Sequence, residues 1–119
     1  MLALSVESIN KAIQLCKENE RYRILVYVCH DNDFVDVVWP VMQEGICDIT
    51  SINHKCIIKF KNGSQIVIVG PSVNQRGVRA DLVLYDQRVA NDKDIMIVLR
   101  CIEAKNTYFK LSTKFKEEI

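Results

Sequence analysis

The chain has 119 residues, of which 49% are hydrophobic and 26% are charged, and its formal net charge is +1. These values predict one soluble domain over residues 1–119, and they exclude a disordered chain and a general electrostatic attraction to nucleic acid. No apolar run approaches the roughly 20 residues of a membrane span and no signal peptide opens the chain, so the sequence predicts no membrane partner.

The five cysteines indicate a reducing compartment. Their number is odd, no CxxC pair exists, and most lie in apolar runs, where a reduced thiol packs as a small apolar group. We therefore expect a cytoplasmic protein.

The first part of the chain predicts a helix followed by a strand. Residues 5–20 place apolar side chains on one helical face, and Ser5 can cap the first turn, with Ser8 as an alternative cap. Residues 22–29, YRILVYVC, form an almost continuous apolar run, which is typical of a strand covered on both faces.

A second helix is expected after this strand. Asn32 or Asp33 can cap it, and apolar residues continue at helical spacing until Gly45 ends it. Pro40 is unfavourable inside a helix, so we expect it to kink this helix or to open a second short one. Trp39 is expected in the core.

Residues 55–70, KCIIKFKNGSQIVIVG, carry the clearest local signal in the chain. Two strand-like runs flank an Asn-Gly pair, which is the strongest short cue for a β-hairpin. Lysines alternate along the first of these strands, and we interpret them as a solvated face that blunts a sheet edge; they are Lys55, Lys59 and Lys61.

The last part of the chain predicts one more strand and an ambiguous segment. Residues 80–86, ADLVLYD, are typical of a strand. Residues 92–105 have helical apolar spacing with Asn91 or Asp92 as a cap, but their IMIVL core is also typical of a buried strand. The order helix, strand, helix, hairpin, strand, helix predicts an α/β three-layer sandwich with a mainly parallel sheet and one β-hairpin.

The segment KFKNGSQIVIVGPSVNQRGVRADLVLYDQ resembles the middle of the ATPase domain of large terminases, the motors that package viral DNA. In that family a strand-turn-strand carrying NGS precedes a loop with an RG step, and a hydrophobic strand ending in Asp-Glu follows. The preceding YRILVYVCHDNDFVDVVWPVMQ is similar to the strand and helix before the family's hairpin. The resemblance implies a reduced P-loop-ATPase-like fold, a phage or prophage origin and a place in the host-cell cytoplasm.

The resemblance assigns roles at the end of the last strand. Asp86 matches the Walker B aspartate, which helps to hold magnesium, and Gln87 stands where the family has its catalytic glutamate. A neutral amide is a much poorer base than a glutamate, although it can still orient a water molecule.

The phosphate-binding part of the family is missing from the sequence. A P-loop needs glycines that let backbone N–H groups surround the phosphates and a lysine that meets their charge. None of the four glycines is followed by lysine, and the resemblance implies that the chain starts after the place of that loop. We therefore expect no ATP hydrolysis by the chain alone and no required cofactor, with Mg²⁺ at Asp86 as the one cation that the resemblance implies.

Two further sets of residues are candidates for a site. The arginines that bracket the last strand are candidates for contact with phosphate or with a nucleic-acid backbone; they are Arg76, Arg79 and Arg88. The segments RADLVLYDQ and IVLRCIEAK also resemble the signature of PD-(D/E)xK nucleases, in which acids and a lysine on adjacent strands bind a metal and activate water. That resemblance implies roles for Asp81, Glu103 and Lys105, with Glu7 as a supporting ligand, and it requires a strand over residues 92–105.

Three hypotheses for function follow from these residues. The first is a non-catalytic module, similar to a terminase ATPase domain, that binds nucleic acid or another viral protein. The second is a small metal-dependent nuclease. The third is a self-associating protein in which an exposed sheet edge pairs with a copy of itself.

Overall fold

The computed structural model describes residues 1–30, 33–42, 47–52, 55–71 and 78–104. Along the chain these residues form β1 (Leu2–Ala3), α1 (Val6–Glu18), β2 (Arg23–Tyr27), α2 (Phe34–Met42), β3 (Cys47–Ile52), β4 (Lys55–Phe60), β5 (Gln65–Val69), β6 (Leu82–Tyr85), a 3₁₀ turn (Gln87–Val89) and a helix over residues 93–104.

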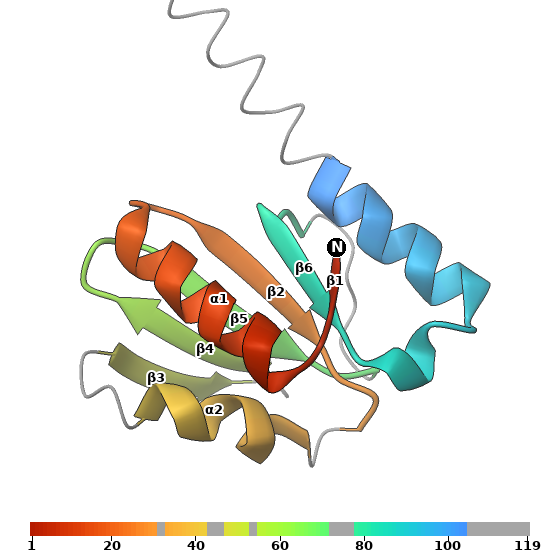
Figure 1. Ribbon diagram of the computed structural model, residues 1–119, viewed down its shortest axis with the longest axis horizontal. Helices are drawn as coiled ribbons and strands as arrows, with labels where there is room; N and C mark the ends of the chain where they lie inside the picture. The colour runs from red at the N-terminus through yellow and green to blue at the C-terminus, as the bar shows by residue number, and fades with distance from the viewer. Residues whose placement is uncertain (31–32, 43–46, 53–54, 72–77, 105–119) are drawn as a thin grey trace, which may run out of the picture.

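The six strands form one sheet in the order β1-β6-β2-β5-β4-β3 (Figure 1). The four strands from β1 to β5 in this order run parallel to one another, and β4 and β3 continue the sheet as an antiparallel meander. The α/β class and the mostly parallel sheet predicted from the sequence are therefore confirmed.

Helices cover both faces of the sheet. On one face α1 and α2 bury Ile13 and Val41 against the strands, and on the other face the 93–104 helix buries Leu99. Neighbouring residues of β2 divide between the two cores, because Ile24 packs in the first and Leu25 in the second. This division explains why β2 is an unbroken apolar run instead of an alternating one.

The ambiguous segment over residues 92–105 is a helix where the structure describes it. Asp92 accepts hydrogen bonds from the backbone N–H groups of Asp94 (3.1 Å) and Ile95 (3.2 Å), so it is the cap of this helix. The buried side chains of Met96, Leu99 and Ile102 follow at the spacing of one helical face.

The hairpin predicted from the Asn-Gly pair joins β4 to β5. Gly63 has a φ of +87°, a left-handed conformation that a residue without a side chain adopts at low cost. The Asn62 side chain accepts a hydrogen bond from Ser64 N–H (3.0 Å) and donates to the carbonyl oxygens of Cys16 (2.7 Å) and Asn19 (3.2 Å). The NGS sequence therefore closes the hairpin and ties it to the end of α1.

Four local features differ from the sequence prediction. β1 and β3 were not anticipated as strands. α2 continues through Pro40 to Met42, so of the two alternatives for this proline the second short helix is wrong, and Gly45 lies outside the described residues. The expected burial of Trp39 is wrong, because 59% of this side chain is exposed: α2 buries Val37 and Val41 instead, and its narrow buried face leaves the tryptophan outside.

Candidate functional site at the carboxyl edge of the sheet

The predicted site residue Asp86 follows β6 directly, at the edge where the parallel strands end. Its backbone N–H donates to the carbonyl oxygen of Tyr27 (2.9 Å), and beyond β2 the N–H of Val28 donates to Val69 (2.9 Å). The ends of β2, β5 and β6 are thus held together, and this edge is where open α/β sheets bind ligands.

The Asp86 carboxylate is surrounded by N–H donors. It accepts hydrogen bonds from the backbone N–H groups of Cys29 (3.4 Å) and Arg88 (3.0 Å), and from the Arg88 guanidinium through Nε (3.1 Å) and Nη2 (2.6 Å). These bonds favour the ionised form, so the Arg88 guanidinium and the two backbone groups lower the pKa of Asp86 from 3.8 to about 2. Only 12% of the Asp86 side chain is exposed.

The same guanidinium also binds Asp33. Arg88 Nη2 forms an ion pair with Asp33 Oδ2, and this carboxylate accepts a second hydrogen bond from the His30 backbone N–H (3.2 Å). Hydrogen bonds to both carboxylates raise the pKa of Arg88 above its ordinary value. Asp33, Asp86 and Arg88 are called the Arg88 cluster below.

Sequence reasoning found the members of the Arg88 cluster but not the cluster itself. Asp33 was assigned to helix capping and Arg88 to contact with phosphate, and 55 positions separate them along the chain. The sequence did carry a signal for the contact between Asp86 and Arg88. An aspartate side chain often accepts a hydrogen bond from the backbone N–H two residues later, and this bond forms a common type of turn. No local pattern pointed to the contact between Asp33 and Arg88.

The Arg88 cluster does not fit a magnesium ion. Mg²⁺ requires several oxygen ligands in near-octahedral geometry, whereas here a guanidinium lies between the two carboxylates and contacts both. Within the described part of the chain, no group of three or more His, Cys, Asp or Glu residues could hold a metal ion. A cation at Asp86 would therefore have to displace Arg88.

Gln87, which the terminase resemblance aligns with a catalytic glutamate, opens the 3₁₀ turn and is exposed. Its side chain makes no hydrogen bond with the residues that the structure describes. The neighbouring Val89 is buried and packs with the 93–104 helix, so this turn serves to lead the chain from β6 into the helix.

The turn from β1 to α1 is the first strand-to-helix turn of the described chain, and it has no phosphate cradle. Only Leu4 and Ser5 separate β1 from α1. Ser5 Oγ accepts from Ser8 N–H (3.0 Å), and Ser8 Oγ accepts from Ser5 N–H (2.8 Å), which is a reciprocal capping box. Two of the N–H groups that would face a phosphate here, those of Ser5 and Ser8, are therefore already bonded within the capping box.

The residues of the nuclease hypothesis lie away from the Arg88 cluster. Asp81 precedes β6 and accepts from the backbone N–H of Arg23 (2.8 Å), at the opposite end of β6 from Asp86. Glu103 lies on the 93–104 helix instead of a strand, Lys105 lies outside the described residues, and Glu7 is exposed in the first turn of α1. The strand that this hypothesis required is therefore absent where the structure describes residues 93–104.

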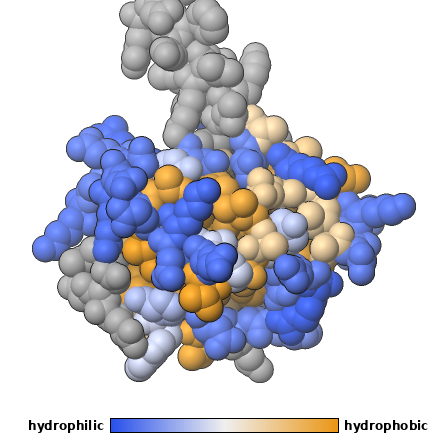
Figure 2. Space-filling model, viewed as in Figure 1, coloured by the Kyte–Doolittle hydropathy of each residue, from blue (hydrophilic) through white to orange (hydrophobic). Residues whose placement is uncertain are grey.

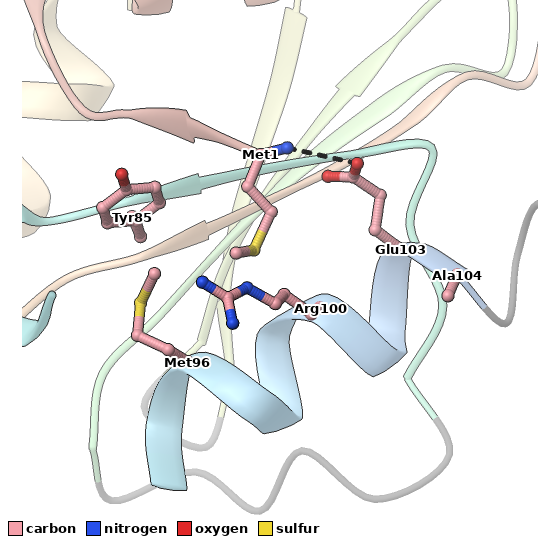
Figure 3. Close-up of a pocket in the computed structure, with 6 residues that line it drawn as sticks. All are labelled: Met1, Tyr85, Met96, Arg100, Glu103 and Ala104. Atoms are coloured by element: carbon pink, nitrogen blue, oxygen red, sulfur yellow. Dashed lines mark hydrogen bonds and ion pairs between the residues drawn. The ribbon is translucent and has the colours of Figure 1, made fainter. Parts of the chain in front are cut away.

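Glu103 binds backbone nitrogen atoms. Its carboxylate contacts the ammonium group of Met1 (3.2 Å) and accepts from Val83 N–H (3.0 Å), so it binds a β6 backbone group just before β1 begins to pair with β6. Beside it lies an open hollow of about 430 Å³, lined by Met1, Tyr85, Met96, Arg100, Glu103 and Ala104 (Figure 3).

The candidate arginines do not converge on one site. Arg88 belongs to the carboxyl edge and Arg79 to the opposite end of β6, so the length of a four-residue strand, roughly 13 Å, lies between them. Arg76 lies outside the described residues. A shared phosphate site formed by these arginines is not seen in the described part of the chain.

A second candidate site is apolar and lies on α2. Three side chains of this helix are more than half exposed, namely Val35, Trp39 and Met42. A groove of about 230 Å³ runs between α2 and the meander, where Ser51 of β3 and Cys56 of β4 line it. Figure 2 shows the same face of the molecule as Figure 1, with apolar surface reaching solvent among charged side chains over α2. This set of α2 side chains with its groove is called the α2 surface below.

Among the described residues, no helix is both long enough and apolar enough to cross a membrane. No protein-family model, curated protein or solved structure matches the chain.

Proposed function

We propose that this protein is a non-catalytic binding module with the architecture of a reduced terminase ATPase domain of phage or prophage origin, and that its partner is a protein. The proposed relation to terminase ATPase domains rests on the sequence motifs that occur in the same order in both. The order strand, helix, hairpin and strand ending in Asp86 is compatible with it.

The residues at the carboxyl edge of the sheet and in the β1–α1 turn support the part of this proposal that expects no ATP hydrolysis. Phosphoryl transfer needs a cradle for the phosphates, a metal and a residue that positions water. Here the capping box of the β1–α1 turn uses the N–H groups of Ser5 and Ser8, Arg88 binds the Asp86 carboxylate, and an exposed glutamine, Gln87, stands where the resemblance expects an acid.

The observation that favours a protein partner over nucleic acid is the α2 surface. Nucleic acid is bound mainly through free cationic groups, whereas the guanidinium of Arg88 already pairs with two carboxylates. Exposed apolar side chains grouped around a groove are typical of protein interaction sites, and tryptophan is among the residues most enriched in them.

A thermal-shift experiment tests the non-catalytic part of the proposal. With millimolar MgATP we expect no change in Tm, because a ligand raises stability only if it binds the folded state at that concentration. A rise in Tm that depends on magnesium would contradict the proposal. An Arg88→Gln variant, measured in parallel, shows whether the Arg88 cluster alone prevents binding.

Dye binding and tryptophan emission test the α2 surface. Trp39 is the one tryptophan of the chain, so its emission reports on this surface alone. We expect the folded protein to bind the apolar dye ANS with quenching of Trp39, and Met42→Ser to reduce the binding. The control is Ile97→Ser on the 93–104 helix, where 56% of the isoleucine is exposed; an equal loss with this control would contradict a specific α2 site.

A further inference from the structure

We propose that the partner on this side of the molecule is a second copy of the chain, which pairs with β3 edge to edge as an antiparallel strand. This inference rests on the proposed function, because it names the partner of the region around the α2 surface. Three observations support it: the backbone N–H and C=O groups that β3 directs away from the sheet, the sequence of β3, and the pairing that two antiparallel copies of β3 can form.

In the sheet that the described residues form, β3 is an edge strand with no strand paired on its outer side. It stands at the end of the strand order, and on its inner side it pairs with β4 over its full length from Cys47 to Ile52. The opposite edge is β1, which has two residues and lies next to the Glu103 contact with Met1. An edge strand of six residues is the longer template for another strand.

The hydrogen-bond pattern shows which groups of β3 face outward. Phe60 N–H donates to Ser64 across the hairpin (2.8 Å), and backbone groups alternate sides along a strand, so Ile57 and Lys59 direct theirs at β3. Their partners in β3 are Thr50 and Asp48. The N–H and C=O groups of the alternate residues Ile49 and Ser51 therefore point away from the sheet, and they have no partner among the described residues.

β3 lacks the features that keep sheet edges apart. Lysine, proline and bulges on an edge strand prevent pairing, but the sequence of β3, CDITSI, contains one charge and no lysine or proline. Lys55 and Lys59, which the sequence suggested as protection for an edge, lie on β4, an interior strand of the sheet. Ile49 is 39% exposed although it lies beside β4 on the face that carries α2.

A second copy of β3 fits this edge by symmetry. With a two-fold axis at Ile49, this residue pairs with Ile49 of the second copy, and each exchanges its outward N–H and C=O with the other. Asp48 then lies opposite Thr50 of the second copy. The two Asp48 carboxylates therefore do not face each other, and each of them lies opposite a threonine hydroxyl. Because Ile49 is on the α2 side of the sheet, the helical layer continues from one copy to the other across the axis.

The experiment measures the mass of the full chain by size-exclusion chromatography with light scattering over a concentration series. We expect a species of twice 13.7 kDa that dissociates on dilution. Ile49→Lys puts two like charges on the axis and is expected to weaken the dimer at least about tenfold. Ile97→Lys, the same change on the 93–104 helix, is the matched control and is expected to leave the dimer unchanged.

Mixing variants tests the axis directly. Ile49→Lys and Ile49→Glu are each expected to be monomers, and an equal mixture is expected to restore the dimer because position 49 faces itself. Ile49→Pro removes an outward N–H that β4 does not use, so it is expected to abolish pairing while circular dichroism shows a folded protein.

Three results would overturn the inference. They are a monomer at every concentration, a dimer that persists in both Ile49→Lys and Ile49→Pro, and a mixture of the two charge variants that stays monomeric. The MgATP experiment is independent of all three, so a nucleotide-binding protein that still dimerises through β3 would refute the proposed function and leave the dimer in place.

Discussion

Arg88 joins two carboxylates that come from opposite halves of the chain, and at the scale of single residues it decides the chemistry of the carboxyl edge. The sequence predicted correctly that Asp86 ends a strand at this edge, because an apolar run closing on an acid is a local pattern. It did not predict that the acid is bound by Arg88 and shared with Asp33, because that arrangement depends on where the turn after β2 lies in space. A local motif therefore predicted the position of Asp86, but it did not predict that Asp86 is paired with Arg88.

The pH dependence of Asp86 gives the prediction at this scale. Its pKa is lowered in the folded protein, so ionised Asp86 stabilises the fold at pH values above its ordinary pKa of 3.8, and this contribution is lost as the pH falls toward about 2. A shift of this size corresponds to about 2.5 kcal/mol at most, and solvent screening of the half-exposed arginine reduces the expected contribution to about 1 kcal/mol. A carboxyl-carbon NMR titration measures the pKa directly.

In Arg88→Gln we expect the Asp86 pKa to rise toward 3.8, because the largest contribution to its lowering is the hydrogen bond from this side chain. Arg79→Gln, at the other end of β6, is the control and should leave the Asp86 titration unchanged. An unaltered Asp86 pKa in Arg88→Gln would show that the backbone donors alone hold the carboxylate.

At the scale of elements, the sequence predicted those whose signals are local. The α1 cap, the apolar run of β2 and the Asn-Gly hairpin each depend on neighbouring residues, and all three are present. β3 was missed because its CDITSI sequence has weak apolar character, and its extended form depends on pairing with β4. The 93–104 segment was ambiguous for a related reason: its apolar core suits a buried helix and a buried strand equally, and only packing against the sheet decides between them.

The turn between β4 and β5 gives the prediction at this scale. Ser64 is 1% exposed, its hydroxyl donates to the carbonyl of Asn19, and it accepts from Tyr22 N–H (3.0 Å). Ser64→Ala removes the acceptor of the Tyr22 N–H and one of the two donors to the Asn19 carbonyl, which keeps its bond from Asn62, so we expect it to lower the free energy of unfolding by about 1–2 kcal/mol in a urea titration. Lys61→Ala, an exposed change in the same turn, should remain within about 0.5 kcal/mol of the wild type, and equal values for the two variants would contradict the role of this turn as a tie to α1.

At the scale of the whole molecule, helices bury both faces of the parallel strands, whereas no described element covers the β3 end of the sheet. The sequence predicted the layered α/β arrangement, since element order and apolar runs determine it. It placed Trp39 in the core because of its residue type, and this failed because α2 lies at the β3 end of the sheet, where no other described residue covers part of its surface. Exposure at such an end is a property of the assembled fold and cannot be deduced from one helix.

Thiol labelling gives a prediction for the molecule as a whole. Cys101 is exposed and should react with iodoacetamide within the native state, whereas Cys16 is completely buried and should react only when the domain unfolds globally. Burial raises the pKa of the Cys56 thiol, so this residue should also react slowly. Peptide mapping by mass spectrometry orders the rates, and fast labelling of Cys16 in native buffer would contradict a closed core between α1 and the sheet.

The tie between the Asn-Gly turn and α1 also bears on chemical ageing. In an Asn-Gly pair the backbone nitrogen of the glycine can attack the side-chain carbonyl carbon of the asparagine and expel ammonia, which forms a succinimide. Water then opens the succinimide to aspartate or isoaspartate. Here the attacking nitrogen, Gly63 N, donates to the Phe60 carbonyl (3.1 Å), and the amide of Asn62 is held by carbonyl oxygens at the end of α1. Deamidation should therefore be slow in the native fold and fast in denatured chains, and each converted molecule would refold with a carboxylate facing carbonyl oxygens.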